Sequence, residues 1–344
     1  MTPTIETAFA SGRNNFNLMR LIAAWLVIYS HSWAITGSAG ADLVGMLTLQ
    51  KSAGALAVDV FFLISGFLVA ASFQRNSLRA FLLARALRIY PALMVCVMLT
   101  VCILGPLLTT ASDYWSNANT WRYLWANASL WRAEFWLPSV FDTLPRTAVN
   151  GSLWTLPIEG RLYLVLMVAG LSGMLAPRRY LPAWTLAMVA AGAFAYLRAP
   201  LPEHLSYLIW VTAFFITGTL GWVYRERIRL SLWPLAALLV SAAVMRGTAG
   251  FSLAYFALIA YGTLYIGLVP RLPVIEKNDL SYGLYLYGWP MQQLALLAGA
   301  ATVLTNTVAA TALALPCAAL SWYLVEKPAL RWKRRVLAAP APIS

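Results

Sequence analysis

Three ionisable side chains stand inside long apolar stretches of the sequence: His31, Asp59 and Glu159. A charged group near the centre of a bilayer costs at least about 2.5–3.5 kcal/mol, so the groups that remain there are candidates for function. Counted from the predicted outer ends of their helices at about 1.5 Å per residue, all three lie roughly 8–11 Å below the outer membrane boundary. A carboxylate bound to one histidine nitrogen raises the basicity of the other. The pattern therefore predicts acid–base chemistry in the outer half of a membrane.

Arginines mark a second place where chemistry is predicted. Arg20 precedes His31 on one predicted helix; at 100° per residue both side chains share a face, about 16 Å apart along the axis. Arg85 and Arg88 stand one turn apart at the cytoplasmic mouth of the third predicted helix. Guanidinium groups suit phosphate oxygens, such as those of coenzyme A. Ordinary anchoring by positive charge explains the same pair, so both interpretations stay open.

Structural interpretations compete with the functional ones for several of these residues. Asp59 or Glu159 could pair with Arg161 in an ion pair that only holds the helices together. Tyr163 and Tyr285 have the positions of core or interfacial aromatics as well as of binding residues, and position alone does not separate these roles.

The composition identifies the solvent for which the chain is built. Its 344 residues are 61% hydrophobic and 11% charged, with a mean hydropathy of +0.70. A soluble domain carries about 25% charged residues, so a soluble enzyme is excluded. Two histidines, and three cysteines inside apolar runs without a Cys-x-x-Cys pair, predict no metal site. The net charge of +13 follows membrane topology, so it does not indicate nucleic-acid binding.

Ten apolar segments are long enough to cross a bilayer as helices. They are 18–36, 53–73, 89–110, 152–174, 181–197, 205–224, 230–246, 250–269, 280–299 and 302–325. With the N-terminus inside, the cytoplasmic segments hold seventeen of the 25 Lys and Arg residues and the outer segments six, as the positive-inside rule predicts. The sequence thus predicts an all-α integral membrane bundle of about ten helices with both termini cytoplasmic. One transmembrane domain, 1–335, is followed by a short tail, 336–344.

The outer segment 111–151 is rich in tryptophan. Its five tryptophans fit either an aromatic belt at the membrane interface or a carbohydrate-facing platform or lid. Those residues are Trp115, Trp121, Trp125, Trp131 and Trp136.

Six motifs in order resemble those of the membrane-bound acyltransferase-3 family, over nearly the whole chain. They are Asn14 to Arg20 leading to His31; Val58 to Leu68; Phe81 to Pro91 with Arg85 and Arg88; Gly151 to Glu159 followed by Tyr163; Ser281 to Leu286; and Val325 to Pro328. The resemblance implies a ten-helix enzyme that takes an acyl group, usually acetyl, from cytoplasmic acyl-CoA. The acceptor would be a hydroxyl of an extracytoplasmic polysaccharide, lipopolysaccharide or lipid-linked glycan.

The resemblance also assigns roles to residues. His31 would be the catalytic base or a brief acyl carrier, assisted by Glu159 or Asp59. Arg20, Arg85 and Arg88 would serve the acetyl-CoA donor, with no metal involved. The candidates for acceptor binding are Trp154, Tyr163, Arg161 and Tyr285. The expected location is a bacterial inner membrane, with lipid around the protein and an undetermined oligomeric state.

Three positions depart from the family pattern. Asn17 stands where an aspartate is common, so no carboxylate partner for Arg20 is expected there. Arg161 replaces an uncharged residue, and would either attract an acidic acceptor or neutralise Glu159. Gly288 stands where many members have a histidine, so no second intramembrane histidine is expected. Because no esterase-like domain follows the last helix, the membrane domain is expected to handle the acceptor alone.

Two other classes of function stay open at this point. A transporter or flippase of a sugar or acyl donor would also place charges inside the membrane. Against it, the sequence has no repeated half and no pair of Gly- or Pro-broken helices in corresponding positions. A sensor of acylated lipid or polysaccharide would not need a cytoplasmic arginine pair in register with an outer histidine.

Overall fold

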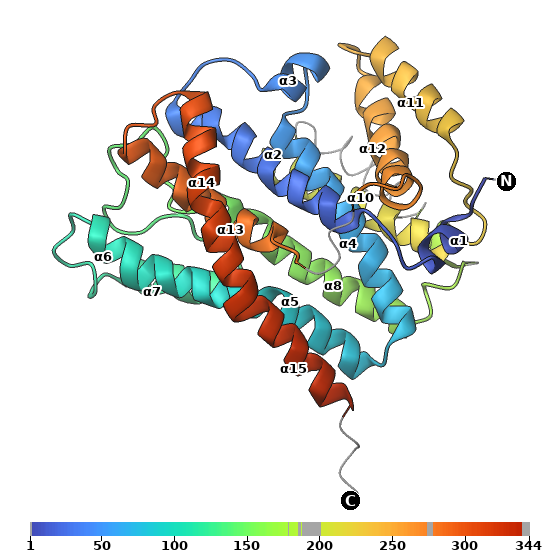
Figure 1. Cartoon of the computed structure of the whole chain (residues 1–344), viewed down its shortest axis with the longest axis horizontal. Coiled ribbons are helices and arrows are strands. Elements are labelled where there is room, and N and C mark those ends of the chain that lie inside the picture. The colour runs from blue at the N-terminus through green and yellow to red at the C-terminus, as the bar shows by residue number, and fades with distance from the viewer. Residues whose placement is uncertain (1, 178, 185–186, 188–200, 274–277, 339–344) are drawn as a thin grey trace, which may run out of the picture. The chain divides into compact units, whose positions relative to one another are not determined.

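Helices account for the regular structure of the chain in the computed structural model, which describes residues 2–177, 179–184, 187, 201–273 and 278–338 (Figure 1). Within those ranges the one extended pairing is an isolated bridge between Thr4 and Arg229. The N-terminal helices are α1 (Ile5–Ala10), α2 (Phe16–Thr36), α3 (Leu43–Thr48), α4 (Ala53–Arg75), α5 (Leu78–Leu99), η1 (Thr100–Leu104), α6 (Gly105–Leu108), α7 (Ala118–Ser129), η2 (Gly151–Trp154) and α8 (Thr155–Leu171). The C-terminal helices are α10 (Glu203–Val223), α11 (Leu232–Val244), α12 (Phe251–Leu268), α13 (Ser281–Leu297), α14 (Val303–Ser321), η3 (Trp322–Glu326) and α15 (Lys327–Ala338).

Seven described helices are long and apolar enough to cross a membrane, which confirms the all-helical membrane fold. They are Phe16–Thr36, Ala53–Arg75, Leu78–Leu108, Gly151–Leu171, Glu203–Val223, Phe251–Leu268 and Val303–Lys333. Two further predicted spans are shorter helices, α11 with 13 residues and α13 with 17. At 1.5 Å per residue α11 reaches about 20 Å, less than the thickness of the hydrocarbon core. The predicted span 181–197 lies mostly outside the described residues.

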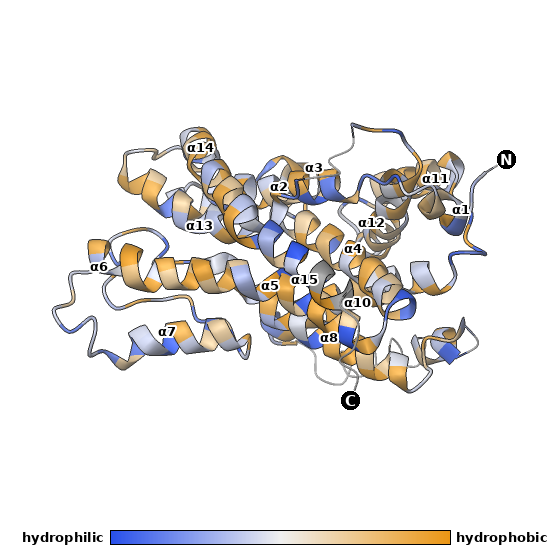
Figure 2. Cartoon of the chain, turned by 60° about the horizontal axis from the view of Figure 1, so that its bottom comes forward, coloured by the Kyte–Doolittle hydropathy of each residue, from blue (hydrophilic) through white to orange (hydrophobic). Residues whose placement is uncertain are grey.

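The third spanning helix begins eleven residues before the predicted 89–110 segment. Ser77 caps α5, because its hydroxyl accepts a hydrogen bond from the N–H of Ala80. The helix then continues through η1 and α6 to Leu108. Arg85 and Arg88 therefore lie on the helix itself. The last helix likewise continues past 325, where Figure 2 shows the change from the apolar α14 to the polar α15.

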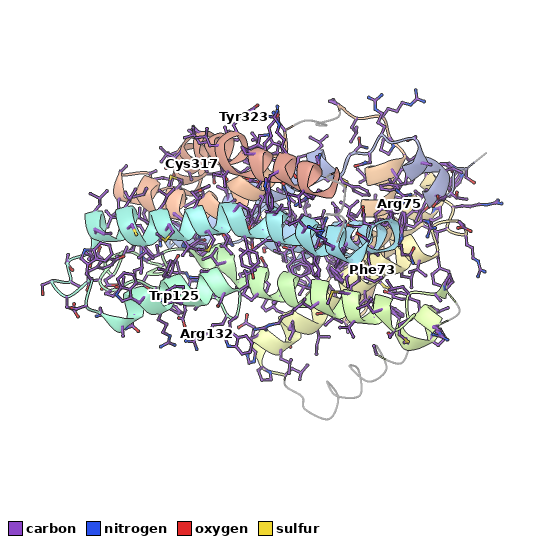
Figure 3. All side chains as sticks on the ribbon, turned by 90° about the horizontal axis from the view of Figure 1, so that it is seen from below. Phe73, Arg75, Trp125, Arg132, Cys317 and Tyr323 are labelled. Carbon is purple, nitrogen blue, oxygen red and sulfur yellow. The ribbon has the colours of Figure 1, made fainter. Side chains whose placement is uncertain are left out.

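One compact unit comprises residues 1–23, 43–75 and 161–276. Its α4 and α10 pack so closely that a side chain at Gly66 would collide with the carbonyl of Phe215. A side chain at Gly218 would collide in the same way with the carbonyl of Leu63. Small residues that let backbones approach are typical of helix packing in membranes. Figure 3 labels Phe73 and Arg75 near the end of α4.

The second compact unit comprises residues 24–42, 76–160 and 277–344. In it α13 and α14 lie side by side (Figure 1), and a Cβ at Gly283 would lie 2.8 Å from the Cα of Ala318. On α13 a Cβ at Gly288 would lie 2.8 Å from Ile28 Cγ1 of α2. This packing explains the glycine at 288, since a histidine there would displace Ile28.

Candidate functional site

His31 lies on α2 and contacts an aromatic side chain of α13. The ring centroids of His31 and Trp289 are 4.8 Å apart, with the planes at 72°, an edge-to-face arrangement. The Nδ1 atom of His31 is buried and meets no hydrogen-bond partner among the described residues. A histidine with a purely structural role usually satisfies its buried nitrogens. The imidazole is thus held by packing, with its Nδ1 unpartnered within the described part of the chain.

A network of polar side chains holds α2, α13 and α14 together next to His31. Gln292 Nε2 donates hydrogen bonds to Ile28 O (2.8 Å) and Ser32 Oγ (2.9 Å). Asn306 Nδ2 donates to Gln292 O at 3.0 Å, and Thr307 Oγ1 donates to Ser32 Oγ at 2.9 Å. Gln292 and Asn306 are fully buried. Buried hydrogen bonds between helices fix their rotation in a membrane, so this network orients the helix that carries His31.

The end of the outer segment is tied to one face of α13. Gln293 Nε2 donates to the carbonyls of Arg146 (2.6 Å) and Ala148 (2.9 Å), and Trp289 Nε1 donates to the same Ala148 carbonyl at 2.9 Å. One turn earlier on α13, the carbonyl of Leu286 accepts a hydrogen bond of 2.9 Å from Asn150 Nδ2. The Trp289 ring occupies the space that a side chain at the next residue, position 151, would need. Trp289 therefore contacts both His31 and the start of η2.

Tyr285 joins the start of α8 to α13. Its hydroxyl lies 2.6 Å from Ser152 O, to which it donates, and 2.7 Å from Thr155 Oγ1. Trp154 ends η2 and Glu159 lies on α8, both half-buried. The structure thus places Tyr285 and the Trp154 segment in the unit that holds His31.

Arg88 is held between two carboxylates. Its guanidinium nitrogens lie 2.7 Å from Asp279 Oδ2 and 3.5 Å from Glu326 Oε2, and its side chain is 14% exposed. Asp279 also accepts hydrogen bonds from Ser281, and Glu326 accepts one of 3.0 Å from Ser321 Oγ. Arg88 thereby ties α5 to the start of α13 and to η3. A phosphate that approached Arg88 would compete with both carboxylates.

The other predicted donor residues have different surroundings. Arg85, half-buried, precedes Arg88 by one turn of α5. Arg20 lies on α2 like His31, but belongs to the other compact unit.

Asp59 belongs to the first compact unit and anchors three helices there. Its two oxygens accept hydrogen bonds of 3.0 Å from Trp210 Nε1 on α10 and Tyr255 OH on α12. Lys51 Nζ lies 3.9 Å from the Trp210 ring centroid, a cation–π contact. Burial lowers the pKa of Lys51, and the Asp59 carboxylate opposes that shift. Asp59 is 1% exposed, so both its oxygens are engaged inside the unit.

Two candidates for acceptor binding also lie in the first unit. The hydroxyl of Tyr163 lies 3.2 Å from Ser65 Oγ, and its ring centroid lies 6.4 Å from that of Phe215. Tyr163 is buried and Arg161 is exposed.

The tryptophans of the outer segment are all exposed, from 42% for Trp121 to 76% for Trp131. The other face of α7, with Thr120 and Tyr123, is buried, and Figure 3 shows Trp125 on α7 and Arg132 in the segment after it. This exposure fits both an interfacial belt and a carbohydrate platform.

Several residues of the site were not predicted from the sequence. Asp279 and Glu326 bind Arg88 across elements far apart in the chain, which no local pattern reveals. The sequence did offer a signal for Gln292 and Gln293, which follow Trp289 inside a predicted span. Two adjacent amides inside a predicted span are expensive in hydrocarbon and so are candidates for function.

A family model decides the class of the protein. The model for the acyltransferase domain of the acyltransferase-3 family matches residues 13–326. The chain belongs to this family. The protein is therefore an integral multi-pass membrane acyltransferase, which agrees with the seven long apolar helices among its described residues.

Two relatives are similar over almost their full length. The chain is 28% identical to an O-acetyl transferase of Shigella phage Sf6, over 91% of this chain and 95% of the relative. It is 30% identical to nodulation protein 10 of Rhizobium leguminosarum bv. viciae, over 95% of each. No solved structure matches the chain significantly.

Proposed function

We propose that this acyltransferase moves an acetyl group from cytoplasmic acetyl-CoA to a hydroxyl of an extracytoplasmic saccharide or lipid-linked glycan. The bilayer concerned is a bacterial inner membrane, crossed by about ten helices with both termini in the cytoplasm. An O-acetyl transferase among the relatives supports acetyl as the group and oxygen as the acceptor atom. The proposed donor side and acceptor side follow from the depths of the arginines and of His31 along the helices.

The observation that carries the proposal is the environment of His31. Its ring is held by Trp289, while its buried Nδ1 has no hydrogen-bond partner in the described part of the chain. Such a nitrogen is suited to take the proton of a hydroxyl that enters the site.

The proposed reaction has one transfer step. The His31 imidazole takes the proton of the acceptor hydroxyl as its oxygen attacks the thioester carbonyl. The carbon–sulfur bond then breaks, and the coenzyme A thiolate leaves with the proton from the imidazolium. The products are an acetyl ester and free coenzyme A. Alignment of the base, hydroxyl and thioester supplies much of the rate.

The arginines divide into two roles in this proposal. Arg85 binds the phosphates of the donor, and Arg20 also serves the acetyl-CoA donor. Arg88 holds Asp279 and Glu326 in place and so shapes the helix face that presents Arg85. Glu159 assists the base from α8, and Asp59 stabilises the first unit through Trp210 and Tyr255.

Thermal unfolding of the detergent-purified protein tests the donor. A ligand at about 100 times its Kd raises the stability of the folded state by roughly 2.7 kcal/mol. Acetyl-CoA should raise the unfolding midpoint of the wild type and of Arg79→Gln, a control at an exposed arginine of the same helix. Arg85→Gln should lose the shift. A wild type without a shift at saturating acetyl-CoA would remove acetyl-CoA as the donor.

A further inference from the structure

Buried hydrogen-bond acceptors gather around Trp289. Within the described chain, Gln292 Oε1, Gln293 Oε1 and Ser152 Oγ are buried atoms without a hydrogen-bond partner, like Nδ1 of His31. The residues Gln292, Gln293 and Ser152 are 0–1% exposed. An unsatisfied buried polar atom lowers the stability of the folded protein, so several of them close together in the chain require an explanation.

These atoms belong to one neighbourhood. Gln292 and Gln293 follow Trp289 by one turn of α13. Trp289 contacts the ring of His31 and fills the space beside position 151, next to Ser152. The four acceptor atoms thus belong to residues that contact Trp289, follow it by one turn, or adjoin one of its contacts.

The hydrogen bonds that Nε2 donates fix the orientation of each glutamine side-chain amide. Gln293 Nε2 donates to the carbonyls of Arg146 and Ala148, and Gln292 Nε2 donates to Ile28 O. Since a carbonyl accepts and does not donate, the NH₂ end must face these carbonyls. The Oε1 atoms therefore point away from them as acceptors, and they require donors from elsewhere.

We propose that Gln292 Oε1, Gln293 Oε1 and Ser152 Oγ form the subsite that binds hydroxyl groups of the acceptor sugar beside the hydroxyl presented to His31. The ligand class is a neutral polyhydroxylated ring, because its O–H groups supply the donors that these oxygens lack. A phosphate or carboxylate would bring further acceptors and would be repelled. This inference rests on the proposed function and names the recognition of its acceptor.

Ser152→Ala is a sharp probe of the subsite. The Ser152 N–H and carbonyl make the hydrogen bonds to Asn150 and Tyr285, and both stay in the variant. Only the hydroxyl without a partner is lost, so the unfolding midpoint should not fall. Ser172→Ala is the matched control, because Ser172 is exposed and follows α8 at its other end.

The experiment measures acetyl transfer from acetyl-CoA to a panel of methyl pyranosides and their monodeoxy analogues, using protein in nanodiscs. In the wild type and Ser172→Ala, at least one deoxy analogue should show a kcat/KM about tenfold below its parent. Ser152→Ala should lower kcat/KM for the parent about tenfold, leave one deoxy analogue unchanged, and keep the KM for acetyl-CoA.

Each other outcome decides against part of the account. Equal discrimination by Ser152→Ala and wild type would overturn the subsite. Turnover of acetyl-CoA without transfer to any pyranoside would overturn the acceptor class. No turnover of acetyl-CoA in the wild type would instead contradict the proposed function.

Discussion

The imidazole of His31 meets the indole of Trp289 edge to face, with ring centroids 4.8 Å apart. The indole is fixed in turn by its hydrogen bond to Ala148 O and by the backbone at Gly151. The Trp289 indole thus fixes one side of the His31 ring. The ring position is set by packing, and its buried Nδ1 has no hydrogen-bond partner among the described residues.

Replacing Trp289 by alanine should misplace His31. We expect kcat for acetyl transfer to fall about ten- to hundred-fold with little change in the KM for acetyl-CoA. Trp289→Phe keeps an aromatic edge and loses only the bond to Ala148 O, so its kcat should lie between those of the alanine variant and the wild type. A rise in donor KM with unchanged kcat would refute a positioning role.

Arg88→Ala should destabilise the protein. The change leaves Asp279 and Glu326 without their cation, and breaking a buried ion pair costs about 3–5 kcal/mol. Thermal unfolding in detergent should show a clear fall of the midpoint for Arg88→Ala and little change for Arg79→Ala. If the midpoint of Arg88→Ala matched that of the wild type while acetyl-CoA binding disappeared, Arg88 would be a donor residue.

Asp59→Asn separates anchoring from catalysis. An amide offers one acceptor oxygen, so either Trp210 or Tyr255 loses its partner. We expect a lower unfolding midpoint, a similar loss in Tyr255→Phe, and a kcat in the folded fraction within about threefold of the wild type. A fully stable Asp59→Asn variant without activity would restore Asp59 to the catalytic group.

The glycine contact between α4 and α10 predicts that alanine variants at different glycines differ in stability. Gly66→Ala should destabilise strongly, because the new methyl group collides with the backbone of Phe215, which cannot move aside like a side chain. Gly160→Ala should be tolerated, since the nearest atom to its Cβ is 3.8 Å away, on Leu130. Unfolding midpoints in one detergent compare the two, and an equal effect would contradict the packing.

The sequence predicts the helical membrane fold because length and hydropathy are local properties. The start of α5 at Leu78 escaped prediction, since the basic residues of its first turns hide a helix that the cap at Ser77 defines. The partners of Arg88 escaped for another reason. Asp279 and Glu326 come from segments about 190 and 240 residues away, and only the packed fold brings them together.

His31 could be singled out from the sequence as a candidate, because an ionisable side chain in an apolar run is unusual by itself. Its contacts could not be found in this way, since only the packed fold shows that Trp289 meets the imidazole and which groups the two glutamines bond. Asp59 gave the same signal as His31, and the structure shows its two oxygens bonded to Trp210 and Tyr255.

The most direct test is acetyl transfer by His31→Ala in nanodiscs with saturating acetyl-CoA, beside His204→Ala, which removes the other histidine of the chain at an exposed position. We predict that His31→Ala folds, binds acetyl-CoA and loses transfer by about 10²–10⁴-fold, while His204→Ala keeps the wild-type rate. A folded His31→Ala protein with a near-normal rate would contradict the account.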